Sequence, residues 1–308
     1  MPKMFVLPSP IMEIDFFKDK KITLLMKRED LIHPFVSGNK YRKLKYNLHH
    51  ISDLHIKNTV TKGGTFSNHI HAAAAAGKVY NFNTFGIIRG EKISNKTLDF
   101  AEAQGMKLFF VSRQEYRKID ESNFRDFLPT FDEGVFFIPE GGTNIFAIKG
   151  VAEMVEEIRE QMPILPDYIC CACGTGGTIS GIIEGAKGEM NIVGFSALNG
   201  NFMQKEVEEK LQFFSTKKYQ NWQIQEDYHF GAYAKVTEEL LDFVRFFKGK
   251  YQILLDPIYT SKMMFGIFDL IQKGFFKENS KILAIHTGGL QGWNGIDTTF
   301  LENFDTQP

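Results

Sequence analysis

The residues best suited to chemistry in this 308-residue chain are a lysine, two tyrosines and several glycine-rich loops. Lys40 follows Gly38 and Asn39 in the segment SGNKYRKL, residues 37–44. A lysine behind such a turn is either surface charge or an amine held in place for covalent chemistry. The second role requires loss of the amine proton, which burial or neighbouring positive charge favours because both lower the pKa.

The loop CGTGGTISG, residues 173–181, follows a predicted strand and opens a predicted helix. Its free backbone N–H groups and the positive end of the helix dipole can hold a phosphate, and Thr175 and Thr178 add hydroxyls. The dinucleotide fingerprint would need glycine in place of Ile179, and the P-loop would need a lysine that this loop lacks. A plain glycine turn remains the structural alternative.

A second loop, GGTFSNHIHAA at residues 63–73, has the same order of strand, glycines and helix. Ser67 is well placed as a helix N-cap, the commoner role for a serine there. His69 and His71 are two positions apart and so lie on different sides of a helix, which argues against a shared metal ion. Both are expected to be packing or surface residues, and no metal site is predicted.

Two tyrosines and three cysteines complete the candidates. Tyr233 follows a glycine in GAYAK, and Tyr259 follows Asp-Pro in LDPIYT, where proline prevents smooth entry into a helix. Taken alone, each is typical of a half-buried aromatic residue.

The three cysteines fall within one predicted strand and are expected to be small buried side chains, since a zinc site would need further ligands; they are Cys170, Cys171 and Cys173.

Strands and helices must alternate to position these loops. Strands are predicted at 58–64, 83–90, 107–112, 167–174, 191–198 and 281–289, and helices at 67–79, 97–105, 144–161, 178–187, 237–247 and 263–276. This alternation predicts an α/β fold with parallel sheets covered by helices on both faces. We expect a smaller α/β lobe at 44–143 inserted into a larger lobe made from 1–43 and 144–308. Sites then belong at strand C-termini and in the cleft between lobes.

Composition narrows the possible partners. A formal net charge of -1 and the absence of long like-charge blocks give no reason to expect nucleic acid. The N-terminus lacks an apolar stretch of signal-peptide length, and no window approaches the roughly 18 apolar residues of a membrane span. No membrane association is expected, and the protein is predicted to be cytoplasmic.

The motifs, taken in order, resemble the fold-type II enzymes that use pyridoxal phosphate, the tryptophan synthase β-like group. Within it they are most similar to the family of 1-aminocyclopropane-1-carboxylate (ACC) deaminase and D-cysteine desulfhydrase. The resemblance spans about residues 27–292 and rests on KREDLIHPFVSGNKYRKL, GGTFSNH, CGTGGTISG, GAYAK, LDPIYTSK and HTGG. It implies a two-lobed fold, pyridoxal phosphate as cofactor, a small amino-acid substrate and a homodimer.

The resemblance also implies roles for individual residues. Lys40 would form the Schiff base with the cofactor, and Asn68 would face the hydroxyl of the cofactor ring. Ser67 would touch the substrate or shuttle a proton, while Lys43 would lie near the phosphate or remain solvated. The phosphate itself would be held by Gly174, Thr175, Gly176, Gly177 and Thr178.

The family has two substrate-pocket tyrosines 26 residues apart, a spacing that Tyr233 and Tyr259 share. Thr260 stands where ACC deaminases have a glutamate, and Thr287 where they more often have leucine. Neutral hydroxyls beside the cofactor favour a neutral pyridine, which suits α,β-elimination. The favoured reaction is therefore D-cysteine desulfhydrase-type elimination to pyruvate, ammonia and sulfide, the preference for a D-amino acid coming from the family alone.

Three alternatives stay open. The first is ACC deamination to 2-oxobutyrate and ammonia. This reaction removes no Cα proton and needs the cofactor to withdraw electrons more strongly. The second is a non-catalytic binder of pyridoxal phosphate or another phosphate ligand, and the third a Rossmann-like nucleotide binder. His71 also stands where the family usually has arginine, which leaves the exact substrate undetermined.

Overall fold

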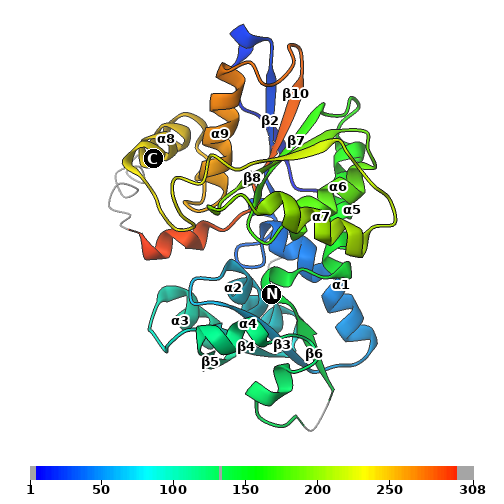
Figure 1. Ribbon diagram of the computed structural model, residues 1–308, viewed down its shortest axis with the longest axis vertical. Helices are drawn as coiled ribbons and strands as arrows, with labels where there is room; N and C mark the ends of the chain where they lie inside the picture. The colour runs from blue at the N-terminus through cyan, green and yellow to red at the C-terminus, as the bar shows by residue number, and fades with distance from the viewer. Residues whose placement is uncertain (1–4, 132–133, 297–308) are drawn as a thin grey trace.

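Two open sheets, one in each lobe, form the framework of the molecule (Figure 1). The computed structural model describes residues 5–131 and 134–296, so both ends of the predicted larger lobe extend outside the described residues. The larger sheet has the order β1-β2-β10-β7-β8-β9 and the smaller β5-β4-β3-β6. The strands are β1 (Ile11–Glu13), β2 (Thr23–Lys27), β3 (Asn58–Gly64), β4 (Asn83–Arg89), β5 (Lys107–Val111), β6 (Val135–Ile138), β7 (Tyr168–Cys173), β8 (Asn191–Ser196), β9 (Trp222–Gln225) and β10 (Lys281–Ile285).

The helices follow the strands in the predicted alternation, which confirms the α/β fold class. They are α1 (Gly38–Asp53), α2 (Asn68–Tyr80), α3 (Lys96–Ala103), α4 (Arg113–Lys118), α5 (Ile145–Gln161), α6 (Gly177–Ala186), α7 (Met203–Phe214), α8 (Glu238–Tyr251) and α9 (Thr260–Gln272). Among the short 3-10 turns, η3 (Phe124–Phe127) and η4 (Glu140–Gly142) matter below.

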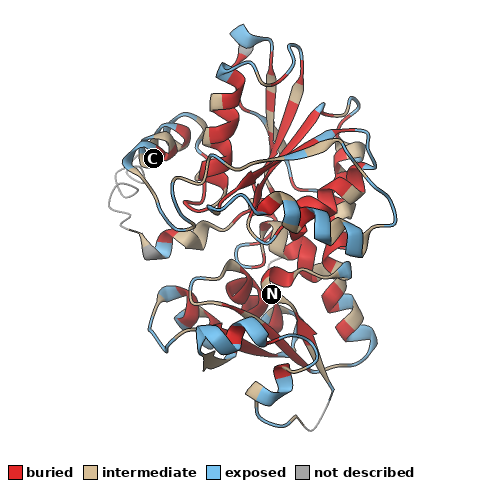
Figure 2. Ribbon diagram, viewed as in Figure 1, coloured by how far each residue is buried: buried red, intermediate tan, exposed pale blue. Residues whose placement is uncertain are grey.

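The larger sheet is buried on both faces, as Figure 2 shows for its central strands. Side chains alternate along β7: Cys170 packs with residues of α8 and α9, whereas Cys171 and Cys173 pack with residues of α5, α6 and α7. All three cysteines are free and buried, which confirms their predicted packing role. A strand covered on both faces suits a parallel sheet, and only the edge strand β1 runs antiparallel to its neighbour among the described strands.

The smaller sheet is parallel throughout its described pairs. The alanine-rich stretch of α2, residues 72–76, is buried and packs against α1 on one side and α3 on the other. Small side chains allow this close approach between helices. The opposite face of the sheet is covered by the segment that contains Ile119 and by η3, through Phe124.

Helix α1 lies between the two sheets in Figure 1 and packs mainly on α5. It begins at Gly38, whose φ of +59° and position rule out a side chain, because a Cβ there would lie 1.9 Å from the Thr287 carbonyl oxygen. Gly150 of α5 cannot carry a side chain either, because a Cβ there would lie 2.0 Å from the Arg42 carbonyl oxygen. The proposed lobe boundary at residues 43/44 falls inside α1 and stays a prediction.

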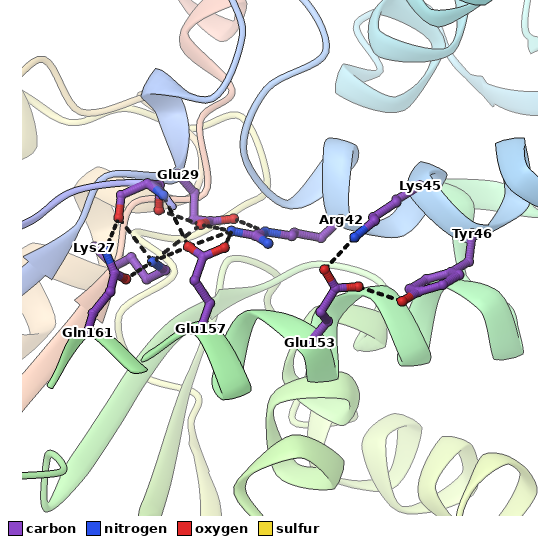
Figure 3. Close-up of polar contacts among 9 residues, drawn as sticks. Lys27, Glu29, Arg42, Lys45, Tyr46, Glu153, Glu157 and Gln161 are labelled. Carbon is purple, nitrogen blue, oxygen red and sulfur yellow. Dashed lines mark hydrogen bonds and ion pairs between the residues drawn. The ribbon is translucent and has the colours of Figure 1, made fainter. Parts of the chain in front are cut away.

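A buried network of charges joins α1 to β2 and α5 (Figure 3). Arg42 donates to both carboxylate oxygens of Glu29 at 2.8 Å and to Glu157 at 2.9 and 3.0 Å. Lys27 donates to Glu157 and to Gln161, both at 2.6 Å. Two cations thus face two carboxylates, and the pairing offsets the cost of their burial. Arg42 is two positions from Lys40, so the network also fixes the start of α1.

Candidate active site

A cavity of about 580 Å³ lies between the two lobes, where strand C-termini meet helix N-termini. Its walls come from the ends of β3, β4 and β7, from the starts of α1, α2 and α6, and from the segment just before α9. Most residues predicted for the site line it. These are Lys40, Lys43, Ser67, Asn68, Gly174, Thr175, Gly176, Thr178, Tyr233, Tyr259 and Thr287.

Lys40 lies in the first turn of α1 and borders this cavity. Burial lowers the pKa of its amine to about 8, and no hydrogen bond joins Nζ to another of the described residues. The helix that carries it is tied to the last loop of the large sheet, because Asn39 N–H donates to the Thr287 carbonyl oxygen at 3.2 Å. An amine with a lowered pKa and no competing partner can act as a nucleophile or a base.

The loop before α6 forms an anion cradle. Gly176 has a left-handed backbone with φ of +74° and turns the chain so that α6 starts at Gly177. The N–H groups of the first helical turn have no partner within the helix, and the helix dipole makes this end positive. A Cβ on Gly177 would lie 2.5 Å from Thr143 Oγ1 and 2.9 Å from Lys43 Nζ, so the lysine amine lies directly beside the cradle.

Lys43 is fully buried rather than solvated. Its amine donates to the Gly141 carbonyl oxygen and to Thr143 Oγ1, each at 3.1 Å. Burial, with the positive charges of Lys40 and Lys210, holds its pKa well below the usual range. An anion bound on the cradle would raise the pKa of Lys43, because its negative charge favours the protonated amine.

The start of α2 supplies two polar groups. Ser67 Oγ accepts from the N–H groups of His69 and Ile70 at 3.2 and 3.3 Å, so it is the N-cap of the helix as well as a lining residue. Asn68 Oδ1 is buried without a hydrogen-bond partner among the described residues. A buried carbonyl oxygen of this kind is costly unless a donor reaches it.

His69 lines the cavity, although it was expected to be a packing or surface residue. The Thr61 hydroxyl donates to the Ile138 carbonyl oxygen at 2.7 Å, so it must accept from His69 Nε2, also at 2.7 Å. Burial and the charges of Lys40 and Lys43 hold the pKa of His69 well below its usual range. The ring is therefore neutral, and Nδ1 is a buried acceptor without a partner among the described residues. Its position just after an N-cap at a strand end was the available sequence signal.

His71 behaves as the sequence predicts. Its ring is buried and stacks on Phe100, with centroids 3.9 Å apart and an interplanar angle of 11°. It does not line the cavity.

The two tyrosines meet on the cavity wall. Tyr259 donates its hydroxyl hydrogen bond to the Tyr233 hydroxyl at 3.1 Å, and the rings are edge to face with centroids 5.8 Å apart. Burial raises the pKa of both phenols, and that of Tyr259 is raised further by Tyr233 beside it. Both are therefore protonated at neutral pH, which suits them to donate hydrogen bonds and not to act as bases.

Thr260 is fully buried and does not line the cavity. Its hydroxyl donates to Asp256 Oδ2 at 2.5 Å and accepts from the Asp256 N–H at 2.8 Å. The single hydroxyl proton is thus already used, which differs from the predicted place of Thr260 beside the cofactor. Asp256 also accepts from the N–H groups of Ile258, Tyr259 and Thr260 at 2.7–3.0 Å. Sequence reasoning missed this aspartate, although Asp-Pro before a helix is a recognisable capping signal.

The residues present fit pyridoxal phosphate. The cradle and Lys43 match a phosphate, and Asn68 Oδ1 needs a donor that a ring hydroxyl could supply. The Lys40 amine has no hydrogen-bond partner within the described part of the chain, so it is available to the cofactor. Among the described residues no group of three or more His, Cys, Asp or Glu is arranged to hold a metal ion.

Comparison with known proteins gives the class. The family model described as pyridoxal-phosphate dependent enzyme matches residues 3–288. The chain belongs to this family of pyridoxal-phosphate dependent enzymes.

Within this family, the chain is similar to relatives named as ACC deaminases or D-cysteine desulfhydrases. The chain is 30% identical over 294 residues to the bifunctional D-cysteine desulfhydrase/1-aminocyclopropane-1-carboxylate deaminase, mitochondrial, of Arabidopsis thaliana, covering 87% of this chain and 73% of that protein. It is 25% identical over 311 residues to the 1-aminocyclopropane-1-carboxylate deaminase of Mesorhizobium japonicum, and the match covers 91% of this chain and 90% of that protein. The crystal structure of an ACC deaminase homologue matches with a TM-score of 0.83 and 25% identity, covering 98% of this chain and 95% of that one. The crystal structure of a hydrogen sulfide-producing enzyme from Fusobacterium nucleatum shares the fold, with a TM-score of 0.71 and 16% identity. The match covers 93% of this chain and 96% of that one.

No helix in the described part of the chain combines the length and apolar character needed to span a membrane.

Proposed function

We propose that this protein is a pyridoxal-phosphate dependent lyase that eliminates the β substituent of a small amino acid, with D-cysteine as the favoured substrate. The observation that carries the proposal is the Lys40 amine, which borders the cavity with a pKa lowered to about 8 beside an anion cradle. The Arabidopsis relative, whose name includes D-cysteine desulfhydrase, supports the choice of reaction.

Separate groups of residues bind the cofactor and remove the substrate proton. The cradle from Gly174 to Thr178 and the Lys43 amine bind the phosphate, and Asn68 orients the cofactor ring. When bound, pyridoxal phosphate withdraws electrons from the Cα of the substrate, which makes the Cα proton removable. Lys40 takes that proton, because its amine forms no hydrogen bond with another of the described residues.

Ser67 and the tyrosine pair bind the remaining parts of the substrate. Ser67 accepts from two N–H groups of α2 and keeps its own hydroxyl proton to donate, and the positive end of the helix dipole lies beside it; both suit the substrate carboxylate. Tyr259 donates its hydroxyl proton to Tyr233, so the protonated Tyr233 is the phenol that donates a hydrogen bond to a departing anion such as sulfide. This bond stabilises the charge that develops as the anion leaves.

The place of Thr260 changes one argument for elimination. Its hydroxyl is engaged by Asp256, so it does not support a neutral pyridine by direct contact. Thr287 still lines the cavity, and Glu140 is the one carboxylate among the described lining residues. ACC deamination therefore remains the second candidate, favoured by the names of the Arabidopsis and Mesorhizobium relatives.

The test is an absorption spectrum of the purified protein with pyridoxal phosphate, before and after addition of D-cysteine. Pyruvate and sulfide are assayed in parallel, with L-cysteine and ACC as comparison substrates. A band near the visible edge that changes as sulfide appears supports the proposal. Formation of 2-oxobutyrate from ACC without sulfide from D-cysteine would favour the second candidate, and a band without any product would indicate a non-catalytic binder.

A homodimer remains a prediction that rests on the family, and sedimentation analysis of the purified protein would test it.

A further inference from the structure

The loop that carries Tyr233 has little structure of its own. Residues 226–236 connect β9 to α8 without helix or strand, and Phe230 and Gly231 both have positive φ, +56° and +96°. Within the loop, Lys235 N–H donates to the Ala232 carbonyl oxygen at 3.2 Å. Contacts from outside the loop must therefore decide where Tyr233 lies.

The side chain of Lys262 supplies such contacts. Its amine donates to three backbone carbonyl oxygens of the loop, those of His229 at 2.9 Å, Ala232 at 2.8 Å and Tyr233 at 3.0 Å. A lysine ammonium has three N–H donors, so all of them are used. The residue is 1% exposed, so these hydrogen bonds are shielded from bulk water.

The ammonium is the form that can make all three hydrogen bonds. Burial lowers the pKa of Lys262 to about 8, an effect that the nearby Asp256 carboxylate opposes. The amine therefore remains largely protonated at neutral pH.

The same helical turn also fixes the second tyrosine. Asp256 accepts from the N–H groups of Tyr259 at 2.8 Å and Thr260 at 2.7 Å, which holds the first residues of α9 in place. Lys262 is three residues beyond Tyr259 on that turn. The start of α9 thus anchors the backbone of both tyrosines, and their hydroxyls meet at 3.1 Å.

We propose that Lys262 is a positioning residue, whose ammonium holds the Tyr233 loop against the start of α9 and so aligns the Tyr233–Tyr259 pair on the cavity wall. Its effect on turnover rests on the proposed function, in which the pair binds substrate. The clamp on the loop does not depend on that function.

The test compares Lys262→Met, which keeps the length of the side chain but has no donor, with Lys262→Arg, which keeps the charge. Lys205→Met is the control, because Lys205 is an exposed lysine of α7 with only an i,i+4 partner at 3.7 Å. Amide hydrogen exchange in residues 226–236 is measured for each protein with cofactor bound. We expect faster exchange there in Lys262→Met, an intermediate rate in Lys262→Arg and no change in the control.

Turnover provides the second measurement. A displacement of about 1 Å at a reacting centre can cost on the order of 100-fold in rate, so kcat should fall 10- to 100-fold in Lys262→Met while the cofactor absorption band persists. Because Lys262 acts through Tyr233, the double variant Lys262→Met/Tyr233→Phe should lose little more than the more impaired single variant. A partial recovery of kcat in Lys262→Arg is also expected.

Unchanged exchange in residues 226–236, or kcat losses that multiply in the double variant, would overturn the inference. If Lys262→Met does not fold, Lys262→Gln takes its place with the same expectations, since its shorter amide cannot reach all three carbonyl oxygens. If the unmodified protein turns over no amino acid, the proposed function fails while the exchange measurement still decides the clamp.

Discussion

The Asn39 side-chain amide donates a hydrogen bond to the Thr178 hydroxyl at 2.9 Å, across 139 positions of the chain. Asn39 is the neighbour of Lys40, and Thr178 belongs to the first turn of α6, beside the anion cradle. One contact therefore ties the proposed nucleophile to the proposed phosphate site, which lie on different segments.

Loss of this contact should weaken cofactor binding. Asn39→Ala removes a hydrogen bond with a net value of about 1 kcal/mol, so affinity for pyridoxal phosphate should fall roughly fivefold. Titration of the cofactor-free protein, followed by absorption, measures the change. An unchanged affinity would show that Gly38 and the Thr287 contact suffice to place the start of α1.

The reaction of Lys40 with pyridoxal phosphate should depend on pH around 8. Burial lowers the pKa of the amine to about 8, so the unprotonated, reactive form increases as pH rises toward that value and then levels off. The rate at which the absorption band forms in the cofactor-free protein should follow the same curve. An ordinary lysine would give a rate that keeps rising toward pH 10, and Lys40→Ala should give no band.

Anion binding should be accompanied by proton uptake at Lys43. Burial and two neighbouring lysines hold its pKa well below the usual range, and a phosphate on the cradle raises it again. Calorimetry with inorganic phosphate in two buffers of different ionisation enthalpy near neutral pH measures the protons taken up. Inorganic phosphate forms no covalent bond with Lys40, and the difference in uptake between the unmodified protein and Lys43→Met isolates the contribution of Lys43. Lys43→Met should bind more weakly and with less uptake.

Thr260→Glu should destabilise the protein. The substitution removes the hydroxyl that both donates to and accepts from Asp256, and it places a second acid beside a buried carboxylate. Each lost buried hydrogen bond costs about 1–3 kcal/mol when its partner is left unsatisfied. Chemical denaturation measures the free energy of unfolding, and Thr260→Ser, which keeps the hydroxyl, is the control. A stable variant with a raised ratio of ACC to D-cysteine activity would instead support a place for residue 260 beside the cofactor.

Arg42→Met should lower the free energy of unfolding by about 3–5 kcal/mol, because it leaves the buried Glu29 carboxylate without the guanidinium that donates to both of its oxygens (Figure 3). The exposed pair of Lys21 and Glu278, at 3.2 Å, offers a matched control. Lys21→Met should change the free energy by less than about 1 kcal/mol. Similar losses in both variants would show that the buried network does not hold α1.

Local pattern was enough to predict the alternating elements and the loops between them. The stretch of alanines in α2, the glycines that end β3 and β7, and the apolar run of β7 each depend on neighbours within a few residues. Short or charged elements such as β1, β6, β9 and α7 were not predicted, because their periodicity is weak over few residues. The candidate site residues, apart from Gly177 and Thr260, line one cavity, as the order of motifs indicated.

The sequence by itself determined the α/β framework and the residue types available to a cofactor. Only the tertiary structure decided how their hydrogen bonds are distributed. Thr260 was predicted to lie beside the cofactor, yet its hydroxyl is used by Asp256. His69 was expected to be a packing or surface residue; it is buried and borders the cavity, and its Nδ1 has no hydrogen-bond partner among the described residues. Spacing along the chain says which side chains are near a turn. Which partner a hydroxyl or a ring nitrogen takes depends on donors and acceptors brought close by segments far away in sequence, and each proton can be donated once.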